Sequence, residues 1–131
     1  MFVPLIWVLC ATETQMNAVI KTSILVFTLA VATLTIGIVL MPSVTVENLT
    51  KFEVLEAEVH VPSSEMNFGP LGPGQKNTIY YSLGQSDGTY EYRFVFKNGF
   101  ALQGSCGYVT GNEVRKRFEI KIKNGNEIIC G

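Results

Sequence analysis

The residues best suited to chemistry in this sequence lie around its single histidine. His60 is close in the chain to Glu58, Ser63 and Ser64, and these residue types could supply a nucleophile, a general base and an orienting carboxylate. Neither serine lies in a nucleophile-elbow motif, and a lone histidine on a strand is usually a surface residue. We therefore expect no catalytic residues and predict that the protein is not an enzyme, with a hydrolytic enzyme as the remote alternative.

The carboxylates near His60 offer a second kind of chemistry. Glu56 and Glu58 alternate with His60, so on a strand all three side chains would share one face. Two carboxylates across a cleft can hydrolyse a glycosidic bond, and two carboxylates with an imidazole can bind one divalent cation. Adjacent positions on one strand more often form a solvated face. We therefore predict no metal, no cofactor and no small-molecule substrate.

The three cysteines limit the metal and disulfide chemistry that is expected. Cys10 lies near the N-terminus, whereas Cys106 and Cys130 both lie in the C-terminal part of the chain. The sequence contains no CxxC motif and no Cys/His cluster, which argues against a zinc site. If this part of the chain is exported, Cys106 and Cys130 are natural disulfide partners. Two buried free thiols are the alternative.

An apolar helix is predicted ahead of the part of the chain that contains His60, Cys106 and Cys130. Residues 23–41 read SILVFTLAVATLTIGIVLM, without a charge, and Pro42 follows them. This run is longer than the apolar part of a cleaved signal peptide and has no Ala-x-Ala site after it. We predict an uncleaved transmembrane anchor over residues 18–41, which is long enough to cross a bilayer. Its representative membrane residues are Ser23, Phe27, Leu29, Leu34, Ile38 and Met41.

The residues around the anchor bear on its start and its orientation. Residues 1–17 form an N-terminal extension that is too short and too polar at its end to span. Either Met16 is the true start or the extension lies at the membrane interface. Lys21 lies just before the uncharged run of residues 23–41, so the positive-inside rule favours a cytoplasmic N-terminus. We expect a single-pass protein of the bacterial inner membrane, with residues 42–131 periplasmic or otherwise extracytoplasmic.

Residues 42–131 have the alternating pattern of short β-strands. Asn98-Gly99, Asn124-Gly125 and Asp87-Gly88 are hairpin dipeptides, typical of type I′ turns. Strands are expected over residues 44–46, 55–61, 77–83, 90–96, 100–106, 114–123 and 127–130. The fold class is therefore mainly β, with one transmembrane helix followed by a small antiparallel immunoglobulin-like sandwich of about seven strands.

The alternation also predicts where individual side chains point. Leu55 should share the buried face of its strand with Ala57, Val59 and Val61. Cys106 and Cys130 should each end a strand, and these two strands should run in the same direction. Both cysteines would then lie at one end of the domain.

Charged residues and one tyrosine are the candidates for an interaction surface. The basic strand over residues 114–123 could be a solvated strand, could pair across the sheet with the acidic strand, or could meet acidic partners or anionic headgroups. Tyr80 and Tyr81 point to opposite faces, so one of them is exposed. The net charge of −1 argues against nucleic acid as a partner. The candidate surface residues are Arg115, Arg117, Lys121, Lys123, Glu56, Glu58 and Tyr80.

The order of motifs resembles that of short uncharacterised bacterial envelope proteins. After the anchor come VTVEN, an alternating strand, FGPLGPGQ, an aromatic strand, FKNG and GYVTG. The resemblance covers residues 42–131 and implies an envelope location and a small β-sandwich. It implies no activity and no site residues.

These features predict a membrane-anchored interaction module that does no catalysis. It would contact the lipid bilayer through its helix and bind another envelope protein near the membrane surface, as an accessory subunit or an immunity-type protein. The alternative is a pilin-like filament subunit, because Phe27-Thr28-Leu29 matches part of the pilin processing pattern. Val26 stands where the pilin peptidase needs glycine, and Val31 replaces the later glutamate.

Overall fold

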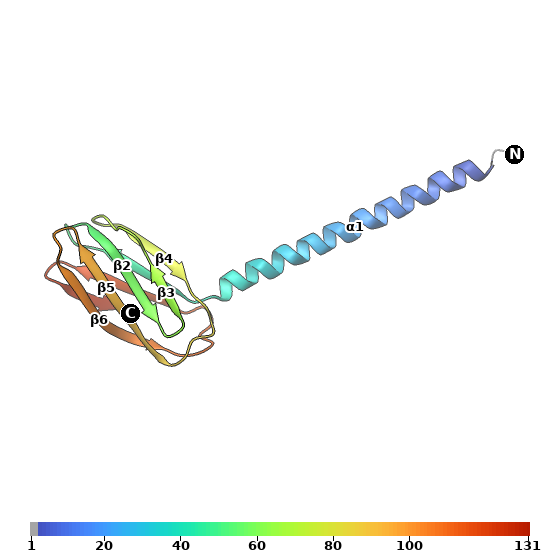
Figure 1. The fold of residues 1–131 in the computed structure, drawn as a ribbon. Coiled ribbons are helices and arrows are strands. Elements are labelled where there is room, and N and C mark those ends of the chain that lie inside the picture. Colours follow the sequence, from blue (N-terminus) through green and yellow to red (C-terminus); the bar gives the residue numbers. More distant parts are fainter. Residues whose placement is uncertain (1–2) are drawn as a thin grey trace. The chain divides into compact units, whose positions relative to one another are not determined.

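The computed structural model describes the backbone of residues 3–131 and the side chains of residues 17–131. It contains one helix, α1 (Val3–Leu40), followed by eight strands. The contacts divide the chain into two compact units, the helix up to Val39 and a β domain over Leu40–Gly131. The predicted fold class, one N-terminal helix followed by a mainly β sandwich, is confirmed at this level (Figure 1).

Helix α1 contains the predicted apolar segment. Asn17–Leu40 is 24 residues long with a mean hydropathy of 2.5, so it is long and apolar enough to span a membrane. The helix ends at Leu40 and not at Met41, because a residue before proline is disfavoured in the helical conformation. The side chains of residues 3–16, and residues 1–2 altogether, lie outside the described part. The two interpretations of the extension therefore stay predictions.

Threonine hydroxyls in the Asn17–Leu40 part of α1 are satisfied within the helix. Thr22, Thr28, Thr33 and Thr35 each donate a hydrogen bond to a backbone carbonyl three or four residues earlier. A hydroxyl in hydrocarbon needs such an internal acceptor, because no water is there to replace it. These four threonines are therefore compatible with a lipid environment.

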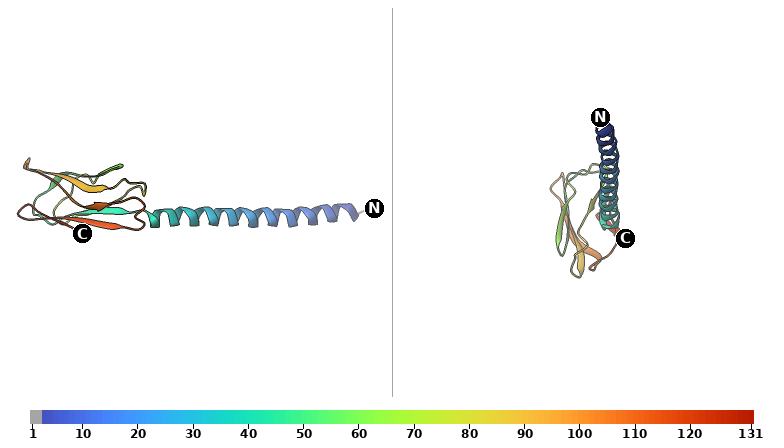
Figure 2. Two further views of the ribbon diagram at one scale, coloured as in Figure 1. Left: turned by 90° about the horizontal axis from the view of Figure 1, so that it is seen from below. Right: turned by 90° about the vertical axis from the view of Figure 1, so that its right-hand side faces the viewer.

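The β domain consists of two four-stranded sheets, drawn as two layers in Figures 1 and 2. We refer to them as sheet A, with the order β4-β1-β7-β8, and sheet B, with the order β3-β2-β5-β6. The strands are β1 (Ser43–Asn48), β2 (Val54–Val61), β3 (Ser64–Asn67), β4 (Lys76–Tyr80), β5 (Gly88–Phe96), β6 (Ala101–Val109), β7 (Arg117–Lys123) and β8 (Glu127–Cys130).

Most neighbouring strands are antiparallel, as predicted, but β1 and β7 are parallel. Parallel neighbours require a long connection between them, and nearly the whole domain separates β1 from β7. The β3 strand was not predicted, because its four residues are too few to show an alternation. It forms a tight hairpin with β2, in which His60 lies opposite Glu65.

The prediction that Leu55 is buried is wrong. A register shift between Val54 and Glu56 interrupts the pairing of β2 with β5. This irregularity places Val54 in the core, fully buried, and leaves Leu55 exposed. The residues after it, Ala57, Val59 and Val61, are buried as predicted. A bulge of this kind leaves no mark in the hydrophobic pattern, because both Val54 and Leu55 are apolar.

The three predicted turns differ in detail from type I′ hairpins. Gly99 has a positive φ of 85°, whereas Asn98 does not. The Phe96 carbonyl accepts from the Gly99 N–H, and the Phe96 N–H donates to the Phe100 carbonyl. This is a three-residue hairpin loop that ends in a left-handed glycine. In the β7–β8 loop the positive φ angles lie at Gly125 and Asn126, one residue later than predicted.

The prediction of a hairpin at Asp87-Gly88 is wrong. Gly88 begins β5 in sheet B, whereas the preceding β4 belongs to sheet A. Segment 81–87 therefore crosses from one sheet to the other. Gly88 is a glycine for a packing reason, because a Cβ there would come within 2.6 Å of Pro62 Cγ.

The core between the sheets is aliphatic and aromatic. Tyr90 stacks on Phe118 with ring centroids 3.8 Å apart, and its hydroxyl bonds to the Tyr81 hydroxyl at 2.8 Å. Burial raises the pKa of both tyrosines, so both hydroxyls stay protonated at neutral pH. The fully or almost fully buried apolar residues include Val44, Val46, Val54, Ala57, Val59, Phe94, Ile120 and Ile122.

Candidate functional site

The strand β6 forms a long, uncharged sheet edge, which we call the β6 edge and define as Ala101–Val109. It pairs with β5 on one side and with no other strand of sheet B. Its nine residues, ALQGSCGYV, contain no charge and most of them are exposed. An edge of this kind offers unpaired backbone groups to another strand.

The register shows which backbone groups of the β6 edge face outward. Phe96 donates to the Phe100 carbonyl, so the directly bonded pairs of this hairpin continue at Phe94–Leu102 and Tyr92–Gly104. In an antiparallel pair the bonded positions alternate with non-bonded ones. The N–H and C=O groups of Ala101, Gln103 and Ser105 therefore point away from β5.

The other three sheet edges are protected in ways that the β6 edge is not. The strands β3, β4 and β8 have four, five and four residues. Each also carries a charged side chain, namely Glu65, Lys76 and Glu127 respectively. Short length and charge are the usual devices that stop edge-to-edge pairing. Of the four edges, only β6 lacks both.

The predicted disulfide is present and links the two sheets. Cys106 on β6 and Cys130 on β8 are bonded, with their α-carbons 6.3 Å apart. Cys130 ends its strand as predicted, but Cys106 does not, because β6 continues to Val109. The strand continues through Gly107, whose φ is 67° and where a Cβ would come within 2.5 Å of Phe118. The bond thus ties one edge of sheet B to one edge of sheet A.

The outer face of sheet B carries the acidic residues. Glu56 and Glu58 share this face with His60, as predicted, and the register adds Glu91 opposite His60. Arg93 on β5 pairs with both carboxylates, with Nη1 3.2 Å from Glu56 and 3.7 Å from Glu58. The interpretation that the basic strand pairs with these glutamates is wrong, because β7 belongs to sheet A.

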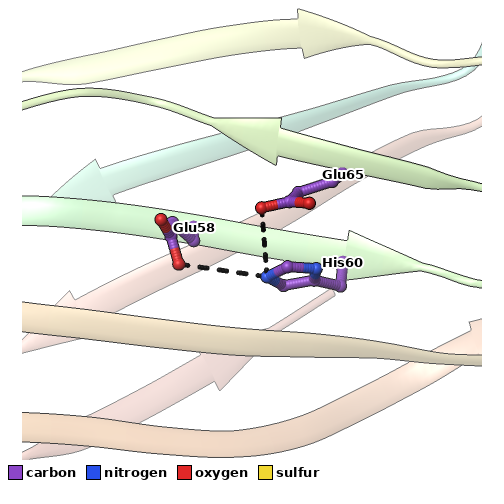
Figure 3. A group of neighbouring side chains, drawn as sticks. All are labelled: Glu58, His60 and Glu65. Atoms are coloured by element: carbon purple, nitrogen blue, oxygen red, sulfur yellow. Dashed lines mark ion pairs between the residues drawn. The ribbon is translucent and has the colours of Figure 1, made fainter.

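Figure 3 shows a second group of ionisable side chains on this face. His60 Nε2 lies 3.9 Å from Glu58 and 4.0 Å from Glu65. One ligand atom from each residue lies within 4.8 Å of the other two, so the group could hold a divalent cation. Glu65 was missed by sequence reasoning because β3 was missed. The group considered from the sequence contained Glu56 in place of Glu65. In the structure Glu56 pairs with Arg93.

The serines near His60 are engaged elsewhere. The Ser63 N–H donates to Gln85 Oε1 at 2.8 Å, and the Ser64 hydroxyl accepts from Gln85 Nε2 at 3.0 Å. Gln85 is almost fully buried, so it fixes the β2–β3 turn against segment 81–87. Both serines thus have a structural partner from another part of the chain.

The basic residues and Tyr80 lie apart from the acidic face. Lys121 and Lys123 are on β7, which is an inner strand of sheet A and not an edge. Lys121 is 3.4 Å from Glu119 on the same strand. The Arg117 guanidinium lies over the Tyr80 ring, 5.4 Å from its centroid. The candidate surface residues therefore occupy two different sheets.

Arg115 lies in the loop over residues 110–116, because β7 begins at Arg117 and not at Val114. Glu113 in this loop is partly buried, which opposes its ionisation. The ion pair with Lys116 and the hydrogen bonds from Thr110 outweigh this, so the pKa of Glu113 is lowered. Lys116 Nζ also donates to the Tyr108 carbonyl. The loop is therefore held in place by a charged cluster.

An aromatic hollow lies at the opposite end of the domain from Pro42. Phe52, Phe96 and Phe100 line it together with residues of the β5–β6 and β7–β8 turns. Phe52 and Phe100 are exposed. Sequence reasoning missed this hollow, because its residues come from three separate loops and no local pattern joins them.

Comparisons with known proteins support the fold and nothing more specific. No protein-family model and no curated protein matches this chain. A similar solved structure is the NMR structure of a protein from Eubacterium rectale, with a TM-score of 0.51 and 14% sequence identity. The likeness covers 70% of this chain and 86% of that one. At this identity it shows the fold alone.

Proposed function

We propose that this chain is a membrane-anchored, non-catalytic interaction protein of the bacterial cell envelope. Its β domain binds an extended segment of another envelope protein at the β6 edge, as an accessory subunit or an immunity-type protein does. The observation that carries the proposal is the uncharged, nine-residue open edge of sheet B. Peptide strands add to such edges through backbone hydrogen bonds, and the side chains supply specificity.

The chemistry of the β6 edge suits strand addition. Small residues at Ala101, Gly104, Ser105 and Gly107 let a second backbone approach closely. The outward N–H and C=O groups of Gln103 and Ser105 are spaced to pair with an incoming strand. The disulfide at Cys106 holds this edge at a fixed position relative to sheet A, which reduces the entropy lost on binding.

Two features support the proposed location. The apolar segment Asn17–Leu40 is long enough to anchor the chain in a bilayer. The Cys106–Cys130 bond suits an oxidising compartment outside the cytoplasm. The orientation follows from Lys21, which lies before the uncharged run of residues 23–41 and favours a cytoplasmic N-terminus. We propose the inner membrane, with the β domain on the extracytoplasmic side.

The test is site-specific photocrosslinking in cells that express the full chain. A photoreactive residue at Gln103 on the β6 edge should capture a discrete partner, and one at Thr78 on the β4 edge should not. The same adduct should appear with a probe at Ser105. Equal labelling from Thr78 and Gln103 would contradict the proposal.

A matched pair of variants separates backbone pairing from side-chain contact. With the crosslinking probe moved to Ser105, Gln103→Ala keeps the outward N–H and should keep the adduct. Gln103→Pro removes that N–H without breaking a bond to β5, and the adduct should be lost. If both variants retain the adduct, the partner does not bind by strand addition.

The filament alternative rests on the continuous helix α1 ahead of a β domain with a disulfide near its C-terminus. Mass spectrometry of the mature N-terminus decides it. Processing immediately before Phe27 would support a pilin-like subunit and would contradict the retained anchor. A mature N-terminus at Met1 or Met16 would support the interaction protein.

A further inference from the structure

The end of the β domain at which the chain leaves α1 has an unusual composition. Segment 110–116 and the end of β4 meet the chain here. The Arg115 N–H donates to the Leu40 carbonyl at 2.9 Å, and Arg117 Nη1 donates to the Met41 carbonyl at 2.6 Å. The Tyr81 N–H donates to the Pro42 carbonyl. We call the exposed side chains around this point the junction surface and define it as Tyr80, Tyr108, Val114, Arg115 and Arg117.

Aromatic and apolar side chains of the junction surface are open to solvent. Tyr80, Tyr108 and Val114 are 47%, 57% and 53% exposed. Tyrosine has an apolar ring and a polar tip, and it is enriched where hydrocarbon meets water. The arginine side chain combines an apolar stem with a guanidinium that matches phosphate oxygens in pairs. These residue types are those of a membrane interface.

The backbone at Arg115 supports a role for its side chain. Its φ is 58°, in the left-handed region, where residues other than glycine, asparagine and aspartate are uncommon. Such a conformation costs free energy and is concentrated at functional positions. Neither burial nor any ion pair within the described residues explains an arginine here, since its side chain is exposed.

Charged groups of both signs lie around the junction surface. Lys116 and Glu113 form an ion pair and neutralise one another. Asp87 precedes Gly88, which pairs with Val109 at the start of the same loop, so a carboxylate also lies near this end. The Arg117 guanidinium contacts the Met41 carbonyl and the Tyr80 ring, and the Arg115 side chain is exposed, so both positive charges lie at this end. Attraction to anionic lipid should be moderate and should depend on these two side chains.

We infer that the junction surface binds the phosphate groups of anionic phospholipids in the membrane that holds α1. The inference rests on the anchoring in the proposed function, because Leu40 and Met41 lie at the membrane surface only if the apolar segment spans. Arg115 and Arg117 contact the phosphates, and the rings of Tyr80 and Tyr108 lie at the level of the headgroups. Binding holds the β domain against the bilayer.

The test uses the full chain in lipid nanodiscs and hydrogen–deuterium exchange. One set of discs contains phosphatidylcholine alone, and the other contains equal parts of phosphatidylcholine and phosphatidylglycerol. Amides of segment 110–116 should exchange more slowly in the anionic discs, by about fivefold for each arginine that contributes. Exchange in residues 54–57 of β2, which pair with Phe96 and Phe94 toward the opposite end of the domain, should be the same in both.

Variants with a matched control identify the residues. Arg115→Gly suits the positive φ, so the domain should stay folded, and it should remove most of the lipid-dependent slowing. Arg117→Gln should act in the same direction. The control is Lys121→Gln with Lys123→Gln, which removes one charge more than either arginine variant but farther along β7, and it should leave the slowing intact.

The possible outcomes distinguish phospholipid binding by the junction surface from the membrane anchoring on which it depends. If α1 is protected in the discs but segment 110–116 exchanges alike in both lipids, the inference fails and the anchor stands. If the lysine control abolishes the slowing as fully as Arg115→Gly, the site does not lie at the junction and the inference fails. If the chain does not enter the discs, both the anchoring and the inference fail.

Discussion

The two lateral sides of the sandwich are closed in different ways. On one side, which we call the closed side, segment 68–75 crosses from β3 in sheet B to β4 in sheet A, and buried Phe68 and Leu71 fill the space between the sheets. On the other side, which we call the open side, the edge strands β6 and β8 are joined by the Cys106–Cys130 bond, and the chain passes from β6 to the inner strand β7 through loop 110–116. The β6 edge lies on this open side.

Polar contacts extend the difference between the sides. On the closed side Asn48 is completely buried, and it donates to the carbonyls of Phe52 and Leu71 while accepting from Thr50. Van der Waals contact and hydrogen bonds therefore hold the closed side together. On the open side a covalent bond links β6 to β8, and β6 remains an edge strand of sheet B.

The largest expected effect is on the closed side. Phe68 is 3% exposed, so Phe68→Ala leaves a cavity and should lower the free energy of unfolding by about 3–5 kcal/mol. Phe100 is exposed on the β6 side of the β5–β6 turn, and Phe100→Ala serves as the control with a much smaller loss. Urea unfolding followed by near-UV circular dichroism measures both. Equal losses would remove the distinction between the sides.

Breaking the disulfide tests the open side. Cys106→Ala with Cys130→Ala should lower the free energy of unfolding by about 3 kcal/mol, because the unfolded chain regains the freedom of the closed loop. Amide exchange should speed up in β6 and β8 first and leave β2 little changed. A reductant should destabilise the wild-type chain similarly and should not affect the double variant. A uniform increase in exchange over both sides would contradict this picture.

The buried amide of Asn48 has the next expected effect. Asn48→Ala removes one acceptor and one donor group and leaves the Phe52 and Leu71 carbonyls without that partner. The free energy of unfolding should fall by about 2 kcal/mol. Asn124 accepts from the Lys51 N–H at an exposed site, so Asn124→Ala should cost much less. A loss at Asn124 as large as that at Asn48 would show that burial does not set the difference.

The smallest effect concerns the tyrosine pair in the core behind the open side. Tyr90→Phe removes the bond to the Tyr81 hydroxyl and should cost about 1 kcal/mol. Burial raises the pKa of both hydroxyls in the folded state. The protonated hydroxyls therefore contribute their full stabilisation below the tyrosine pKa of the unfolded chain, about 10. The free energy of unfolding falls as the pH rises above that value. Unfolding at successive alkaline pH values should show a shallower decline in Tyr90→Phe.

Much of the β domain follows from local pattern. The alternation around Tyr90–Phe96 and Phe118–Ile122 predicts strands whose inner faces are buried, and both are found. The cysteine pair could be predicted because only two cysteines lie in the domain. The register shift at Val54–Glu56 and the strand β3 were missed, since neither changes the local hydrophobic period.

The candidate sites were harder to predict, because they are made by residues far apart in the chain. Glu56, Glu58 and His60 share a face as expected, yet their neighbours Arg93 and Glu65 come from β5 and β3. The β6 edge could not be recognised from its sequence, since ALQGSCGYV reads equally as an inner strand. Whether a strand is an edge depends on which other strands pair with it.

The sequence by itself determined the apolar helix, the alternating strands and the residues able to form the disulfide, because helix length, side-chain period and cysteine chemistry are local properties. Only the tertiary structure decided that β1 and β7 are parallel, that β6 is left open and that Arg115 meets Leu40. These features arise from the pairing of distant segments. The backbone bonds and packing that select such pairings involve the whole domain at once.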